Sequence, residues 1–293
     1  MRIGIIDIGS NTARLLVAGI EGGRLERIRE RRAFLGLGEA IEQTGALPEA
    51  KLVETAALAE SYATAARSAG IDVLDVIVTA PGRQGKNGDE LVARLLAATH
   101  AQVRVISCEE EGRYAYDGAV ATLDDGPFGP LAVCDVGGGS SEVVIGDADR
   151  RPTYVRSFDL GSMRLTSRFL LRKPDAASVA AAREFVAERL DTLDPPPPAR
   201  ALATGGTARA LRRVCGKTLD ADRLEHAIAE LTSRSPGRVA AAYDLERARA
   251  RTLLGGAIIL AEVGRRLGAP FTVSRGGLRE GAALAVARVA QAA

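Results

Sequence analysis

The chain has 293 residues, 46% hydrophobic and 26% charged, a composition typical of globular proteins and a length sufficient for two domains. A net charge of +2 gives no general case for nucleic-acid binding, and three scattered cysteines and two histidines give no zinc or disulfide framework. The most apolar helical segment, 253–263, is too short for a membrane span, so we expect neither a nucleic acid nor a membrane as partner.

The first half of the chain starts with a three-stranded meander and continues with alternating helices and strands. We expect strands at 2–7, 13–20 and 24–32, a helix at 49–69, a strand at 72–79, a helix at 88–99, a strand at 102–107 and a helix at 109–120. Because the first strand begins almost at Met1, no signal peptide is expected, and unpaired cysteines suit a reducing cytoplasm.

The second half repeats this order after a glycine- and proline-rich linker at 124–130. We expect strands within 131–146 and at 153–158, a helix at 175–190, a strand at 201–203, helices at 207–214, 221–232, 235–242 and 245–267, a strand at 271–274 and a helix at 278–291. The repeat predicts an α/β fold with mixed sheets and two domains, 1–125 and 126–293, whose last helix could pack back on the first domain.

Two glycine-rich turns follow strands that end in aspartate. The first turn reads Asp7-Ile8-Gly9-Ser10-Asn11-Thr12, and the second reads Asp135-Val136-Gly137-Gly138-Gly139-Ser140-Ser141. Glycines let backbone N–H groups approach an anion closely, and an aspartate at the strand end is placed to hold Mg²⁺. The residues of either turn alone are also typical of an ordinary β-hairpin. Both turns, however, share the order of apolar strand, aspartate, glycine and polar residue, and apolar strand, which indicates a duplicated phosphate-binding hairpin.

Further groups could complete a phosphate site. The side chains of Asn11, Ser140 and Ser141 could add donors, and Gly205-Gly206-Thr207 opens a helix whose N-terminus favours an anion. Neutralising charge could come from Mg²⁺ on three carboxylates, Asp7, Asp135 and Glu142. For Glu142, a solvated strand position is the alternative.

Candidates for a phosphate-binding cation and for a general base come after the strands at 72–79 and 102–107. Arg83 comes after the strand at 72–79, and arginine suits bidentate phosphate contact, although a surface loop charge is also possible. Three glutamates, 109–111, start a helix, where acids are also favoured by the helix dipole. With so few histidines, the general base must be a carboxylate, and at most two of the three can face one cleft.

These segments, with Gly277-Leu278-Arg279-Glu280-Gly281, resemble the exopolyphosphatase/guanosine-pentaphosphatase (Ppx/GppA) phosphatases over nearly the whole chain. The resemblance implies two duplicated ribonuclease-H-like domains of the actin-like ATPase superfamily, each with a mixed five-stranded sheet flanked by helices, and an active site in the interdomain cleft. It implies Mg²⁺ or Mn²⁺ as cofactor, Glu111 as the catalytic base that orients water, and Arg83 on the substrate chain. It places Asp135 and Glu142 in the second phosphate motif, with Glu142 also catalytic, and implies a homodimer.

The leading hypothesis is therefore an exopolyphosphatase that releases terminal orthophosphate from inorganic polyphosphate. Hydrolysis of guanosine pentaphosphate (pppGpp) is the alternative within the same fold, although the sequence reveals no guanosine pocket. A sugar or acetate kinase also uses paired phosphate turns but needs an acceptor pocket. A non-catalytic sensor of polyphosphate or nucleotide would bind tightly without turnover.

Overall fold

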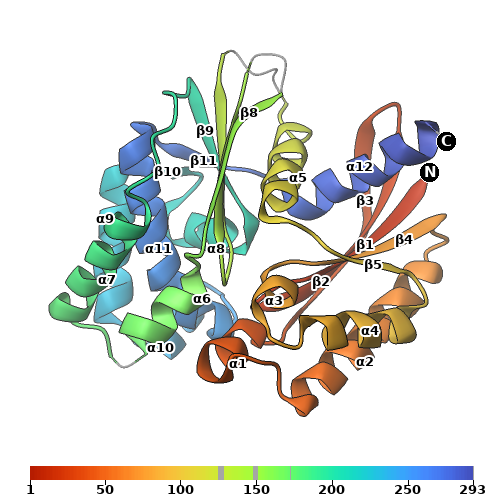
Figure 1. Cartoon of the computed structure of the whole chain (residues 1–293). Helices are drawn as coiled ribbons and strands as arrows, with labels where there is room; N and C mark the ends of the chain where they lie inside the picture. The colour runs from red at the N-terminus through yellow and green to blue at the C-terminus, as the bar shows by residue number, and fades with distance from the viewer. Residues whose placement is uncertain (125–128, 148–150, 172, 293) are drawn as a thin grey trace. The chain divides into compact units, whose positions relative to one another are not determined.

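The computed structural model describes residues 1–124, 129–147, 151–171 and 173–292, which form two compact units (Figure 1). The first unit comprises Met1–Ala121 and Gly276–Ala293, and the second comprises Thr122–Arg275. Most of the predicted linker, 125–128, lies outside the described residues. Among the described residues, no helix combines the length and apolar character that crossing a membrane requires.

A five-stranded mixed sheet in the order β3-β2-β1-β4-β5 is the centre of the first unit. Its strands are β1 (Arg2–Ile8), β2 (Thr12–Glu21), β3 (Arg24–Phe34), β4 (Val73–Val78) and β5 (Gln102–Val105). The first three pair antiparallel, as short hairpin turns require, whereas β4 pairs parallel with both β1 and β5. The carboxyl ends of β1, β4 and β5 therefore lie at one edge of the sheet.

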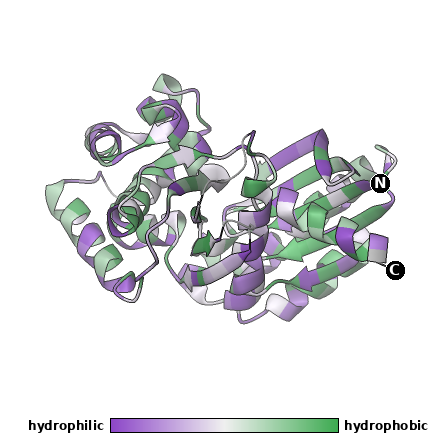
Figure 2. Ribbon diagram, turned by 90° about the horizontal axis from the view of Figure 1, so that it is seen from above, coloured by the Kyte–Doolittle hydropathy of each residue, from purple (hydrophilic) through white to green (hydrophobic). Residues whose placement is uncertain are grey.

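Helices cover both faces of this sheet. They are α1 (Leu37–Thr44), α2 (Glu49–Arg67), α3 (Ala80–Gln84), α4 (Gly88–Thr99), α5 (Cys108–Val120) and α12 (Leu278–Ala292). Ile6 and Ile8 of β1 pack in one core with residues of α2 and α4, and Ile3 and Ile5 pack in another with residues of α12. Because β1 is buried on both faces, its sequence is a nearly continuous apolar run. Figure 2 shows hydrophobic residues in green along strands in the part of the ribbon that carries the N-terminus.

The last helix, α12, joins the first unit by close packing on α5. A Cβ atom added at Gly118 would lie 1.9 Å from the Gly277 carbonyl oxygen, and one added at Gly281 would lie 1.9 Å from that of Tyr114. The two backbones therefore approach as only glycine permits. Glu280, 1% exposed, accepts hydrogen bonds from the Gly277 N–H at 3.0 Å and from Arg27 of β3 at 2.8 Å.

The second unit has a six-stranded sheet in the order β10-β11-β9-β6-β7-β8. Its strands are β6 (Leu131–Val136), β7 (Ser141–Gly146), β8 (Pro152–Phe158), β9 (Arg200–Thr204), β10 (Thr218–Leu219) and β11 (Phe271–Val273). The order β8-β7-β6-β9-β11 repeats the order of the first sheet with the same strand directions, so the expected duplication is confirmed. The expectation of five strands was wrong here, because β10 has only two residues and pairs antiparallel with β11.

The helices of the second unit are α6 (Ser162–Leu165), the π-helical turn η1 (Thr166–Leu170), α7 (Ala176–Arg189), α8 (Gly205–Cys215), α9 (Ala221–Ser233), α10 (Pro236–Ala242) and α11 (Arg247–Leu267). The apolar segment 253–263 is part of α11 and belongs to the core of this unit. Short elements that the sequence did not predict, α1, α3, α6, η1 and β10, have at most eight residues each.

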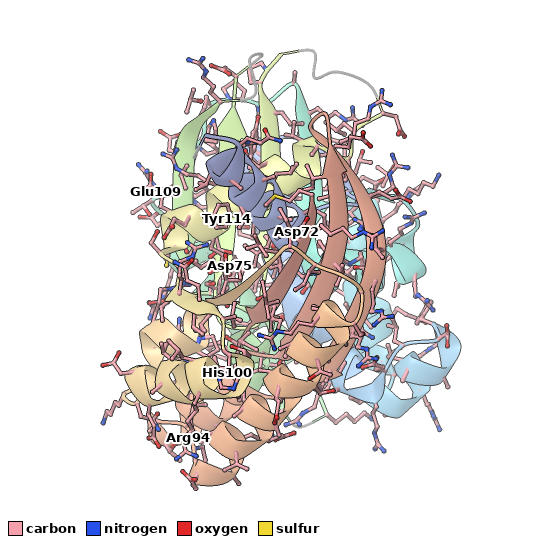
Figure 3. All side chains as sticks on the ribbon, turned by 90° about the vertical axis from the view of Figure 1, so that its right-hand side faces the viewer. Asp72, Asp75, Arg94, His100, Glu109 and Tyr114 are labelled. Atoms are coloured by element: carbon pink, nitrogen blue, oxygen red, sulfur yellow. The ribbon has the colours of Figure 1, made fainter. Side chains whose placement is uncertain are left out.

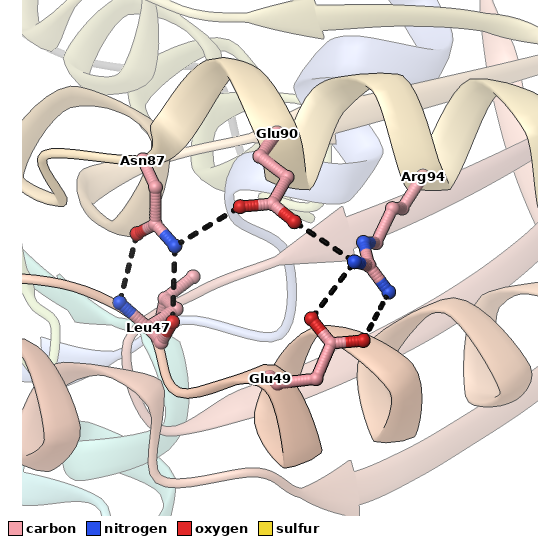
Figure 4. A network of polar contacts seen from close by, with 5 residues as sticks. All are labelled: Leu47, Glu49, Asn87, Glu90 and Arg94. Carbon is pink, nitrogen blue, oxygen red and sulfur yellow. Dashed lines mark hydrogen bonds and ion pairs between the residues drawn. The ribbon is translucent and has the colours of Figure 1, made fainter.

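A polar network holds the connection between α3 and α4 in place (Figure 4). The Asn87 side chain donates to the carbonyl oxygen of Leu47 at 3.0 Å and accepts from its N–H at 2.8 Å. Arg94 of α4 contacts Glu49 of α2 through two hydrogen bonds, of 2.9 and 2.8 Å, and Glu90 of its own helix at 2.8 Å. The segment that follows α3, the helix of Arg83, is thus tied to α2.

Candidate active site

The first glycine turn joins β1 to β2 and is shaped by its own backbone. The N–H of Gly9 donates to the carbonyl oxygen of Thr12 at 3.0 Å. The carbonyl oxygens of Ser10 and Asn11 accept from N–H groups of the segment 35–38, at 2.8 to 3.2 Å. Within the described part of the chain, the N–H groups of Ser10 and Asn11 donate to no protein group. The carbonyls of the turn thus bond within the protein, whereas the N–H groups of Ser10 and Asn11 stay available as donors, as an anion-binding turn requires.

Polar side chains surround this turn. The Nδ2 atom of Asn11 is buried and has no hydrogen-bond partner among the described residues. An ideal Cβ atom at Gly9 would lie 3.7 Å from Thr79 Oγ1 and 3.9 Å from Asp7 Oδ1. Asp7 and Thr79 are both buried and belong to neighbouring parallel strand ends, β1 and β4. A buried amide donor without a partner is costly, and a phosphate oxygen would satisfy it.

Arg83 and Glu111 form an ion pair in the same unit. Arg83 Nη2 donates to Glu111 Oε2 at 2.8 Å, and Arg83 Nη1 donates to the carbonyl oxygen of Ile106 at 2.7 Å. The two side chains are only 18% and 11% exposed. Arg83 follows β4 and Glu111 follows β5, so both belong to the sheet edge that carries the Gly9 turn.

The three successive glutamates at the start of α5 have three different roles. Glu109 is exposed and points outward, where it pairs with Arg113 at 2.8 Å (Figure 3). Glu110 accepts from the N–H of Ser107 at 2.9 Å, and its own N–H donates to Ser107 Oγ at 3.1 Å, which forms a capping box. Glu111 alone is buried. The pattern Ser-x-x-Glu at 107–110 is the sequence signal that separates the capping glutamate from the buried one.

The second glycine turn has the same backbone design. The N–H of Gly137 donates to the carbonyl oxygen of Ser140 at 3.0 Å, just as Gly9 donates to Thr12. The carbonyl oxygens of Gly137 and Gly138 accept from the first N–H groups of α6, at 2.9 to 3.2 Å. A Cβ atom added at Gly161 would lie 2.2 Å from the Gly138 oxygen, so this turn rests directly on the backbone before α6.

Two acidic side chains share one face of the second sheet. Asp135 and Glu142 are directly opposite in the antiparallel pair of β6 and β7, which points both side chains to the same face. Glu142 is 1% exposed and accepts a hydrogen bond from Ser157 Oγ at 2.9 Å. Sequence reasoning missed Ser157, because only the register of β7 with β8 reveals that it lies beside Glu142.

The third turn, Gly205-Gly206-Thr207, opens α8 and lies against Asp135. A Cβ atom at Gly205, whose φ is +81°, would be 2.2 Å from Asp135 Oδ1. The Thr207 hydroxyl donates to the Val136 carbonyl oxygen at 2.7 Å, and the Ser141 hydroxyl donates to that of Leu160. Both hydroxyls are buried. Both hydroxyls thus donate their protons to backbone carbonyl oxygens, and phosphate binding at these two turns stays a prediction.

The predicted metal ligands are divided between the two units: Asp7 belongs to the first, and Asp135 and Glu142 belong to the second. Among the described residues, no three His, Cys, Asp or Glu side chains gather as a metal-binding group. Mg²⁺ usually takes one or two carboxylates and completes its shell with water and phosphate oxygens. The oxygens of Asp135 and Glu142, on one face beside a glycine, fit that requirement, and metal binding stays a prediction.

Comparison with known proteins identifies the family. The model of the Ppx/GppA phosphatase family matches residues 16–288. The chain belongs to this family. It is 28% identical to exopolyphosphatase 1 of Mycobacterium tuberculosis, over 88% of this chain and 80% of that protein, and 28% identical to exopolyphosphatase 2 of the same species, over 98% of each. The crystal structure of the Aquifex aeolicus Ppx/GppA family member superimposes with a TM-score of 0.83 at 29% identity, and covers 99% of this chain and 98% of that one.

Proposed function

We propose that this Ppx/GppA phosphatase is an exopolyphosphatase that hydrolyses the terminal anhydride bond of inorganic polyphosphate and releases orthophosphate. The observation that carries the proposal is the ion pair of the buried Glu111 with the half-buried Arg83 at the sheet edge of the Gly9 turn. A carboxylate that can accept a proton thus lies beside a cation that suits phosphate. The names of the mycobacterial relatives support the same activity.

In the proposed reaction, Glu111 orients a water molecule and accepts its proton as the water oxygen bonds to the terminal phosphorus. The bond from that phosphorus to the bridging oxygen breaks, and the bridging oxygen leaves with its electron pair on the shortened chain. The N–H groups of the Gly9 turn and the Arg83 guanidinium bind the phosphate oxygens, where the negative charge is concentrated. Arg83 then exchanges its hydrogen bond to Glu111 for one to phosphate, which leaves the carboxylate available as the base.

We also propose Mg²⁺, or Mn²⁺ in its place, as the cofactor. Asp135 and Glu142 would hold it, and it would neutralise charge on the phosphate oxygens when bound. Ser157 keeps the Glu142 carboxylate in position through its hydrogen bond of 2.9 Å. The homodimer and the cytoplasmic location expected from the sequence stay predictions.

A phosphate-release assay tests the proposal. The full chain would be given long-chain polyphosphate, tripolyphosphate and pppGpp, each with Mg²⁺ and with EDTA. We expect orthophosphate from polyphosphate with Mg²⁺ and almost none with EDTA. A clear preference for pppGpp would favour the guanosine-pentaphosphatase activity instead. Tight polyphosphate binding without any orthophosphate, in Mg²⁺ and in Mn²⁺, would indicate a non-catalytic sensor and contradict the proposal.

A further inference from the structure

A cavity of about 490 Å³ lies in the second unit, and its described lining comes from η1, from Leu171, Lys173 and Pro174, and from α9, α10 and α11. Figure 1 labels these three helices. This volume is within the range of small-molecule sites. None of the glycine turns or acidic residues of the candidate active site lines it. Its wall includes the end of η1, and π-helical turns are frequent at functional sites.

The floor of this cavity is aliphatic. It is formed by buried side chains from four helical elements, namely Leu170, Leu231, Val239, Ala250 and Leu254. The described lining has no aromatic ring on which a nucleobase could stack. An occupant that buries methylene groups would gain free energy here in proportion to the apolar surface that it removes from water.

The rim of the cavity is basic. Lys173, Arg234, Arg238 and Arg251 line it, and no carboxylate does so among the described lining residues. Arg234 pairs with Glu230 of its own helix at 3.0 Å. The exposed side chains of Lys173 and Arg238 form no ion pair within the described part of the chain. The two therefore remain available for an anion.

We propose that this cavity binds a small organic anion with an aliphatic body, such as a medium-chain carboxylate. The alkyl chain lies on the leucine floor, and the carboxylate lies at the rim between Lys173 and Arg238. The floor alone would accept any apolar molecule, and the rim alone would accept any anion. The two together select a molecule with one charged end and one alkyl end.

Isothermal titration calorimetry with hexanoate, octanoate and decanoate tests the proposal on the full chain, below the concentrations at which these form micelles. Each added methylene that is buried should tighten binding by about fourfold. Lys173→Ala and Arg238→Ala should each weaken decanoate binding by up to about fivefold, as loss of an exposed charge pair does. Lys217→Ala, which changes an exposed lysine outside the cavity lining, should leave binding unchanged.

Two further probes separate this site from nonspecific adsorption. Decyltrimethylammonium has a similar tail with the opposite charge and should not bind. Ala250→Leu adds a side chain to the cavity wall and should abolish decanoate binding while the protein stays folded, as checked by circular dichroism. The proposal is overturned if affinity does not increase with chain length, if Ala250→Leu binds like wild type, or if ATP binds there and decanoate does not.

Discussion

Replacement of Gly161 by alanine tests whether the shape of the second glycine turn controls activity. Gly161 has φ −129° and ψ 158°, an extended conformation that alanine adopts without strain. An added Cβ atom would nevertheless lie 2.2 Å from the Gly138 oxygen, 2.3 Å from its carbonyl carbon and 2.4 Å from the Gly139 nitrogen. Any effect of the substitution therefore comes from contact with the turn and not from the backbone of Gly161 itself.

The size of the effect follows from these distances. Ordinary contacts of a Cβ atom begin at 3.4 Å. The turn and Gly161 must therefore separate by about 1 Å, since all three nearest atoms belong to the backbone and no side chain can rotate away. A displacement of this size in a phosphate-positioning element costs about 10²-fold in rate. Overpacking of this kind also destabilises a fold by roughly 1–3 kcal/mol.

The assay is the initial rate of orthophosphate release from polyphosphate with Mg²⁺, together with thermal unfolding of each variant. Gly237→Ala is the matched control, because a Cβ atom there meets nothing within 4 Å. We expect Gly237→Ala to keep the wild-type rate and Gly161→Ala to lose about 10²-fold while still unfolding cooperatively. A folded Gly161→Ala protein with the wild-type rate would refute the role of this turn in phosphate positioning.

Three other predictions follow from buried groups. Glu111→Gln should lower the rate of phosphate release by roughly 10²–10⁴-fold, whereas Glu109→Gln, which changes an exposed neighbour, should not; equal rates for the two would refute the assignment of the base. Burial raises the pKa of Glu280, but the charges of Arg279 and Arg27 outweigh it and bring the pKa below its ordinary value. The stabilisation by the charged Glu280 is therefore complete above the unfolded-state pKa, about 4.3, and is lost as the pH falls through the lowered folded-state pKa. The melting temperature of Glu280→Gln should consequently depend less on pH between 3 and 6 than that of the wild type. Parallel melting-temperature curves for the variant and the wild type would contradict this. Burial, and then the charges of Asp135 and Glu142, raise the pKa of the Cys134 thiol well above its usual value. After treatment with a thiol reagent at pH 8, mass spectrometry should therefore find Cys134 modified only in denaturant. Rapid modification of Cys134 in the native protein would contradict its burial.

The sequence by itself determined the order of the elements and the place of the glycine turns. Continuous apolar runs such as 3–6 indicate strands buried on both faces, and an aspartate followed by glycines marks the turn that ends such a strand. These signals depend only on neighbouring residues, so they can be recognised without knowledge of the fold. The repeated order of elements indicated the duplication for the same reason. Elements of a few residues, such as β10 and α3, could not be predicted because they are too short to show a hydrophobic period.

Only the tertiary structure decided what individual side chains do. The Ser-x-x-Glu pattern at 107–110 marks Glu110 as the capping residue, but only the fold shows that Glu109 is exposed and that Arg83 reaches Glu111 from another element. Ser141 and Thr207 belong to predicted phosphate-binding motifs, and their hydroxyls donate to backbone carbonyls of segments distant in the chain. Hydrogen-bond partners and burial depend on residues far apart in the chain, and local sequence does not contain that information.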